Sequence, residues 1–131
     1  MTSKITYLGD LRTTSTHLQS GIQILSDAPT DNNGKGEAFS PTDLVANALG
    51  SCIMTIMAIK ARDLDLNLDN STIDVTKVMQ TEPRRIGKII LDIHINVKTS
   101  EKEQIILERV ARNCPVYLSL NPEIEKDITF N

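Results

Sequence analysis

The feature that most constrains this chain is a long, mostly apolar segment at residues 39–64, "FSPTDLVANALGSCIMTIMAIKARDL". Its start carries clear helix signals. Ser40 suits the N-cap, Pro41 the first helical position, and Asp43 the third residue beyond the cap. This is close to a capping box, with Asp in place of the usual Glu or Gln. We therefore predict one long helix, in which Asp43 has a structural role.

The apolar side chains of this helix spread around most of its circumference. They are Leu44, Val45, Ala46, Ala48, Leu49, Ile53, Met54, Ile56, Met57, Ala58 and Ile59. A helix that is apolar on nearly all sides must be buried on nearly all sides. One sheet of a 131-residue protein covers only one side. We therefore expect the other side to meet a second subunit in a homodimer.

The segments before this helix indicate strands. Residues 4–10, 11–19 and 21–27 are short and separated by turn residues, which predicts an antiparallel meander of three strands. A loop rich in Pro, Asn and Gly follows at residues 28–40, and its length suggests a role at a site.

The segments after the long helix complete the fold. Residues 71–80 and 85–99 predict a hairpin, because the second arm alternates apolar and polar residues. Residues 100–113 predict a second helix that ends at Cys114, and residues 123–130 predict a closing strand. The expected fold is α+β in the order βββ-α-ββ-α-β, as a single domain over residues 1–131.

Composition excludes several functions. A net charge of −3, a pI near 5.3 and an aromatic content of 3% argue against nucleic-acid binding. No uninterrupted apolar run reaches the roughly 20 residues of a membrane span, and the start has no apolar stretch of signal-peptide length. We expect a soluble, cytoplasmic protein without a membrane partner. We also expect that the two cysteines do not form a structural disulfide.

The two cysteines, Cys52 in the long helix and Cys114 at the end of the second, admit two interpretations. Free cysteine often serves as a small buried hydrophobe. The small residues Gly50 and Ser51 before Cys52 instead suggest the close approach of another backbone or of a substrate. A helix C-terminus carries partial negative charge, which raises the pKa of a thiol. Cys114 is therefore a poor primary nucleophile, although a resolving thiol needs position more than acidity.

The histidines give a weaker signal. His17 and His94 lie on expected strands, and no pair of histidines or cysteines has the spacing of zinc ligands. We therefore expect no metal site.

The stretches "SPTDLVANALGSC" and "CPVYLSL" together resemble the OsmC/Ohr family, the osmotically inducible and organic-hydroperoxide-resistance proteins. That family shows S/N-P-x-[DE]-L, then small and apolar residues up to a G/A-x-C, and much later C-P-[VI]. Both motifs occur here in order and in the expected structural contexts. The resemblance covers the whole chain, and it fits best the less characterised OsmC-like branch.

The resemblance implies an intertwined homodimer, with two long central helices packed against antiparallel sheets. It also implies a thiol peroxidase without a metal or bound organic cofactor. By this reading Cys52 attacks an organic hydroperoxide and becomes a sulfenic acid. Cys114 then condenses with it to a disulfide, which an external dithiol reduces. The apolar neighbours of Cys52, namely Leu49, Ile53 and Ile56, would favour alkyl or lipid peroxides over hydrogen peroxide.

The resemblance further implies an activating arginine from the first strands, which Arg12 matches. A guanidinium stays charged and can hold a thiolate and polarise a peroxide. Without the family, Arg12 reads equally well as an exposed strand arginine.

The family peroxidases carry a glutamate directly after the proline to orient this arginine, but this chain has Thr42 there. The acid one place later, Asp43, is turned by about 100° and serves the cap. Glu37, from the loop, either substitutes for the glutamate or is a solvated carboxylate. This departure keeps an alternative open, a redox-sensing or hydrophobic-ligand-binding protein without turnover. A purely structural dimer is the third reading.

Overall fold

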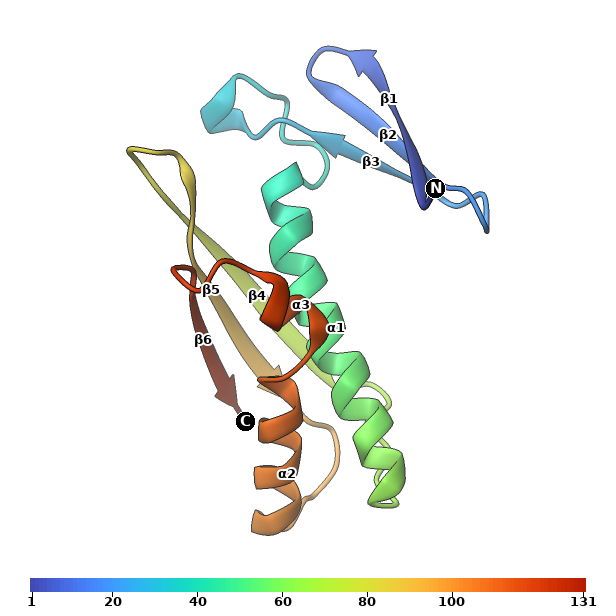
Figure 1. Cartoon of the computed structure of the whole chain (residues 1–131), viewed down its shortest axis with the longest axis vertical. Helices are drawn as coiled ribbons and strands as arrows, with labels where there is room; N and C mark the ends of the chain where they lie inside the picture. Colours follow the sequence, from blue (N-terminus) through green and yellow to red (C-terminus); the bar gives the residue numbers. More distant parts are fainter. The chain divides into compact units, whose positions relative to one another are not determined.

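A computed structural model describes all 131 residues of the chain (Figure 1). The chain forms two compact units, residues 1–45 and residues 46–131. Helices and strands together give the predicted α+β fold. The single domain predicted over residues 1–131 stays a prediction.

The first unit contains the predicted antiparallel meander. Strands β1 (Ser3–Gly9), β2 (Arg12–His17) and β3 (Gln23–Asp27) form one sheet in the order β1-β2-β3. Between β2 and β3 the chain reverses over residues 18–21, where the His17 amide donates to the Ile22 carbonyl at 2.8 Å. This reversal brings Arg12 directly opposite Asp27 in the register.

The loop after β3 is more ordered than the sequence indicated. It contains a short 3-10 helix, η1 (Thr30–Asn32), and then returns to β3. There the Asp27 amide donates to the Phe39 carbonyl at 3.1 Å. Gly34 lies so close to the Ala28 carbonyl that a Cβ on Gly34 would overlap it. The loop therefore folds back tightly and brings Glu37 alongside β3.

Helix α1 (Pro41–Asp63) confirms the long predicted helix, and its residues from Ala46 on belong to the second unit. The other elements of that unit are β4 (Thr72–Gln80), β5 (Arg85–His94), α2 (Glu101–Ala111), α3 (Pro115–Ser119) and β6 (Glu125–Phe130). Strand β5 ends five residues before the predicted end of its arm, at His94 instead of residue 99.

The second sheet differs from the expected antiparallel arrangement. Its order is β4-β5-β6, and β6 pairs with β5 in parallel. The reason is the connection between the two strands. A crossover through α2 and α3 carries the chain back to the start of β5, so that β6 runs in the same direction.

The helices cover one face of this sheet and enclose the core (Figure 1). Helix α1 contributes a buried stripe, β5 the side chains of alternate positions, and α2 one turn of its inner face. The fully buried large side chains are Leu49, Ile53, Met57, Ile89, Leu91, Ile93 and Leu107. This packing uses one side of α1 only.

Gly50 lies in the buried stripe of α1, where the helix approaches the sheet most closely. A Cβ on Gly50 would lie 3.0 Å from Cγ2 of Val75 and 3.6 Å from Cδ2 of Leu91. The small residue before Cys52 is therefore explained by helix–sheet packing within the chain.

The opposite side of α1 is not covered by the chain itself. Ala48, Ser51 and Thr55 are exposed, and Ile59 is 56% exposed. By length and composition alone α1 could cross a membrane. Its buried stripe, however, packs against the sheet as the stripe of a core helix does.

Candidate active site

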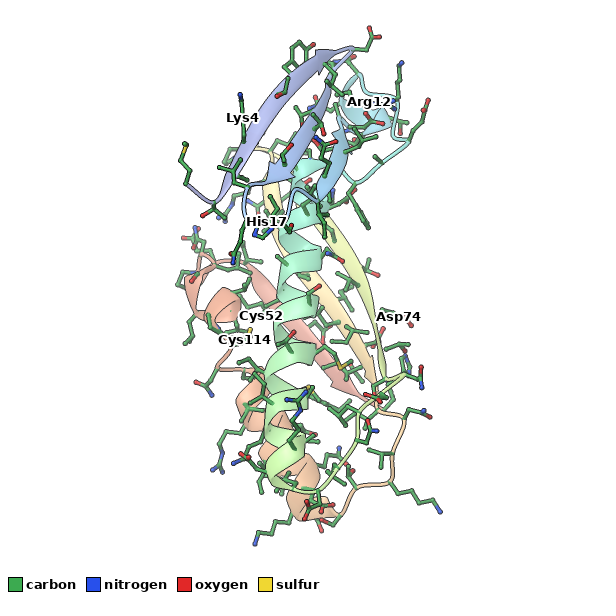
Figure 2. The ribbon with its side chains drawn as sticks, turned by 90° about the vertical axis from the view of Figure 1, so that its right-hand side faces the viewer. Lys4, Arg12, His17, Cys52, Asp74 and Cys114 are labelled. Carbon is green, nitrogen blue, oxygen red and sulfur yellow. The ribbon has the colours of Figure 1, made fainter.

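Two groups of predicted site residues are present, a thiol pair in the second unit and an arginine cluster in the first (Figure 2). The first group contains Cys52 and Cys114, and the second contains Arg12 and Glu37.

Cys52 lies on α1 between the core stripe and the exposed side of the helix. Its neighbours Leu49 and Ile53 are fully buried in the core, whereas Cys52 is half-buried. Leu49 and Ile53 therefore belong to the core and do not line a surface that a substrate could reach. Cys52 is the more accessible of the two sulfurs.

Cys114 is fully buried, and its position corrects the sequence prediction. Helix α2 ends earlier, with Arg112 as its C-cap. Cys114 instead caps the N-terminus of α3, where its sulfur accepts a hydrogen bond from the Tyr117 amide at 3.3 Å. The reason is Pro115, which ends one helix and suits the first position of the next.

The two thiols lie close together. Figure 2 shows their side chains next to each other, and Cys52 is one of the groups that act on the pKa of Cys114. Burial raises the pKa of the Cys114 thiol above its ordinary value, and the neighbouring Cys52 adds to this effect. The Tyr117 amide acts in the opposite direction. Cys114 thus keeps its proton at neutral pH, for a different reason from the helix C-terminus invoked by the sequence.

Arg12 begins β2 directly after a tight turn. Gly9, Asp10 and Leu11 all have positive φ angles, of 86°, 53° and 60°. The Leu11 carbonyl accepts a hydrogen bond from the Ala28 amide at 3.0 Å, which ties the turn to the residue after β3. The turn therefore fixes the backbone from which the Arg12 side chain starts.

Two carboxylates hold the guanidinium of Arg12. Nε and Nη2 donate to the two oxygens of Asp27 at 2.7 and 2.9 Å. Nη2 also donates to Glu37 at 3.1 Å. Glu37 is therefore ion-paired although 66% of its side chain is exposed. The Asp27 side chain, in contrast, is 1% exposed.

The charges in this cluster shift each other's titration. The hydrogen bonds from Arg12 lower the pKa of Asp27 below its ordinary value, although burial acts in the opposite direction. The bonds to Asp27 and then to Glu37 raise the pKa of Arg12. Asp27 is therefore ionised and Arg12 is charged at neutral pH.

Thr42 and Asp43 belong to the start of α1, as the sequence predicted for Asp43. The Ser40 amide donates to Asp43 at 2.9 Å, and the Asp43 amide donates to the Ser40 hydroxyl at 3.1 Å. The Thr42 hydroxyl lies 3.1 Å from that of Ser40. The predicted capping box is confirmed.

A shallow apolar hollow of about 690 Å³ lies beside the arginine cluster in the first unit. It is lined by Gln23, Ile24, Leu25, Gly36, Glu37, Ala38, Phe39 and Asp43. Phe39 is 57% exposed and Leu25 is 47% exposed. Leu25 shares the sheet face of Arg12 and Asp27, because these positions alternate along the paired strands.

The interactions of the two histidines involve no residue of the thiol pair or of the arginine cluster. Nδ1 of His17 lies 2.6 Å from the Ser20 hydroxyl, and Nε2 of His94 lies 3.4 Å from Asp74.

Asp27 is the residue of the arginine cluster that the sequence did not predict. The strand pairing that sets Asp27 opposite Arg12 is the feature that could have identified it.

Comparison with known proteins supports this description. The sequence model for OsmC-like proteins matches residues 34–129. A solved structure from Psychrobacter arcticus 273-4, described as an osmotic stress induced and detoxification response protein, is 48% identical with a TM-score of 0.98, over 100% of this chain and 96% of that chain. No curated protein matches the chain.

More distant structures share the fold. An organic hydroperoxide resistance protein OsmC from Legionella pneumophila is 14% identical with a TM-score of 0.75, over 100% of this chain and 97% of that chain. An organic hydroperoxide resistance protein from Elizabethkingia anophelis is 14% identical with a TM-score of 0.73, over 100% and 96%. Together with the match to the family model, the neighbouring cysteines and the α+β fold lead to one conclusion: the chain belongs to the OsmC-like protein family.

Proposed function

We propose that this protein is a thiol peroxidase that reduces organic hydroperoxides in stress defence. The observation that carries the proposal is that a half-buried Cys52 lies beside a buried Cys114 that keeps its proton. Two structural core cysteines would not need one accessible sulfur beside one protected sulfur. Membership of a family that includes organic hydroperoxide resistance proteins supports the same reaction class.

The proposed reaction proceeds in three balanced steps. The Cys52 thiolate attacks one oxygen of the peroxide, the O–O bond breaks, and the leaving alkoxide takes up a proton to give an alcohol. Cys52 is then a sulfenic acid. Cys114 attacks its sulfur, water leaves, and a disulfide forms. An external dithiol then exchanges with this disulfide, is itself oxidised, and returns both cysteines to thiols.

The difference in burial supports the assignment of the two cysteines. Cys52 is the peroxidatic cysteine, because a peroxide can reach only the accessible sulfur of the pair. Cys114 is the resolving cysteine, because it lies beside Cys52 and its raised pKa makes it the weaker nucleophile at neutral pH.

Arg12 is proposed as the activating residue, which donates hydrogen bonds to the peroxide or to the Cys52 thiolate. Its guanidinium is held by Asp27 and Glu37, and Nη1 keeps two N–H donors without a hydrogen-bond partner. Those donors suit the oxygens of a peroxide. The hollow at Leu25 and Phe39 beside this cluster supports a preference for alkyl peroxides over hydrogen peroxide.

A homodimer is part of the proposal. The exposed side of α1 includes Ala48 and Ile59, and Ile59 is 56% exposed. A second copy that packs its own α1 there would bury both helices on all sides, as their composition demands.

The experiment is stopped-flow oxidation of the reduced protein by cumene hydroperoxide and by hydrogen peroxide. We expect Cys52 to be oxidised faster than free cysteine, and faster by the organic peroxide. Dimedone should trap a sulfenic acid in Cys114→Ser and none in Cys52→Ser. If neither peroxide oxidises Cys52 faster than free cysteine, the peroxidase function is wrong.

The second candidate is a redox-sensing or hydrophobic-ligand-binding protein without turnover. Thr42, which contacts the Ser40 hydroxyl, favours it because the family peroxidases carry a glutamate there. A sensor forms the Cys52–Cys114 disulfide once and is reduced slowly. Steady-state turnover with a dithiol reductant separates the two functions, because only the peroxidase sustains many cycles.

A further inference from the structure

We propose that Asp27 is the positioning residue for Arg12, in place of the glutamate that the family peroxidases carry at the position of Thr42. The inference rests on the proposed function. Asp27 and Arg12 are cross-strand partners on one face of the first sheet, so that their backbones are held by the β2–β3 ladder. The acid therefore comes from a strand and not from the start of α1.

The contact between these residues has the geometry of a fixed pair. Both carboxylate oxygens of Asp27 accept from Arg12, at 2.7 and 2.9 Å, which is the bidentate arrangement that specifies orientation as well as distance. The Asp27 side chain is 1% exposed, so water competes little for its oxygens. One Asp27 oxygen also accepts the Glu37 amide at 3.1 Å, which ties the loop to the same carboxylate.

Glu37 is a weaker candidate for this role. Its single bond to Nη2 of Arg12 is 3.1 Å long, and 66% of its side chain is exposed. An exposed pair loses much of its energy to solvent screening and to side-chain entropy. Glu37 can therefore swing away from Arg12 while the bidentate contact with Asp27 persists.

The donors of Arg12 show what this arrangement leaves for a substrate. A guanidinium has five N–H donors, and Asp27 and Glu37 occupy the one on Nε and the two on Nη2. The two donors on Nη1 have no hydrogen-bond partner. Asp27 therefore sets the direction of the only Arg12 edge that a peroxide oxygen can use.

The pairing of Arg12 points to the same role. Asp27 and Glu37 both pair with its guanidinium, so Arg12 does not act as an unpaired positive charge. It acts through directed hydrogen bonds, which depend on orientation. A misplaced donor then costs more rate than a change of local charge would.

The test compares Asp27→Asn with Asp10→Asn. Asp10 lies on the turn before Arg12, is 82% exposed and pairs with Lys35, so its substitution makes the same chemical change at a carboxylate that pairs with another cation. We expect Asp27→Asn to lower kcat for cumene hydroperoxide at least about tenfold, and Asp10→Asn to leave it unchanged. Glu37→Gln should lower kcat less than Asp27→Asn. A wild-type kcat in Asp27→Asn, or a larger loss in Glu37→Gln, would overturn the inference.

The background variant Arg12→Lys separates positioning from folding. If Asp27 acts through Arg12, then Asp27→Asn costs little further activity once Arg12→Lys is in place. If Asp27 only supports the fold, the same loss recurs in both backgrounds, and the inference is wrong.

A readout without peroxide distinguishes this inference from the proposed function. In nitrogen-edited NMR, the Arg12 Nε–H signal should be protected from exchange in the wild type and in Asp10→Asn, and unprotected in Asp27→Asn. If the wild type shows no peroxidase turnover, the proposed function fails by itself. An Arg12 signal that is unaltered in Asp27→Asn overturns the positioning role whether or not the enzyme turns over.

Discussion

At the scale of single residues, the thiol pair is governed by where each sulfur lies. Cys52 is half-buried on α1, and Cys114 is enclosed at the start of α3. Burial is the main cause of the raised pKa of Cys114, so the buried thiol gains reactivity only when the pH rises. The order in which the two cysteines react therefore follows from their burial.

The raised pKa of Cys114 predicts a pH dependence. In Cys52→Ser, iodoacetamide should alkylate Cys114 more slowly than free cysteine at pH 8. The pH range over which this alkylation rate rises should lie higher than for an unperturbed thiol. The free energy of unfolding should fall as the pH rises. The contribution of the protonated thiol is complete below the unfolded pKa of about 8.5 and is lost as the pH rises through the folded pKa.

Mass spectrometry of the alkylated protein at several pH values measures this rate. Urea-unfolded Cys52→Ser is the control, because its Cys114 is then exposed. Equal rates for folded and unfolded protein would contradict the prediction.

The lowered pKa of Asp27 predicts the opposite dependence at acid pH. The ionised carboxylate stabilises the fold above its unfolded pKa of about 3.9, and this contribution is lost as the pH falls through the lowered folded value. The wild type should therefore unfold at a higher temperature than Asp27→Asn at pH 7, and the difference should shrink at pH 2. Thermal unfolding monitored by circular dichroism measures both. A difference that is independent of pH would show that Asp27 does not titrate with folding.

The arginine cluster shows which site residues could be predicted from the sequence and which could not. Arg12 and Glu37 were predicted, and they do meet. Asp27 was missed because the break between the second and third strands was predicted at residue 20, whereas the strands reverse over residues 18–21. A shift in the centre of a hairpin changes every cross-strand partner, and one sequence without the pairing does not fix it.

At the scale of the elements, α1 was the most predictable because its signals agree with each other. The cap at Ser40, Pro41 at the first helical position and the apolar run all indicate one helix. The parallel pairing of β6 and the short helix α3 were not predicted. Both depend on how the chain crosses over between β5 and β6, and a tertiary path of this kind leaves little periodicity in the sequence.

The contact between α1 and the sheet predicts the effect of enlarging Gly50. Gly50→Leu should destabilise the fold by about 1–3 kcal/mol, because the side chain would press on Val75 and Leu91. Gly50→Ala is the matched control. It gains helix propensity of up to about 1 kcal/mol and adds only a Cβ, which Val75, at 37% exposure, can accommodate by a small shift. Urea unfolding at one protein concentration compares the two, and equal stability would contradict this packing.

At the scale of the whole molecule, family membership gives the fold and leaves the assembly to be measured. We expect twice the chain mass of 14.5 kDa in sedimentation equilibrium. Ile59→Asp should shift the protein toward the monomer, because it puts a charge on the proposed dimer face of α1. The matched control is Ile105→Asp on α2, where Ile105 is 51% exposed against 56% for Ile59. A wild-type monomer, or dissociation by Ile105→Asp alone, would contradict the assembly.

The place of β6 in the second sheet has a consequence for synthesis. Strand β6 pairs along the edge of β5, and the Asn131 amide extends the ladder by donating to the Ile93 carbonyl at 2.7 Å. A nascent chain therefore carries β5 with one open edge until residues 125–131 leave the ribosome. An open strand edge beside apolar residues is a template for pairing with other chains. Chains of this protein that stop before β6 should accordingly be the ones that aggregate or that chaperones capture.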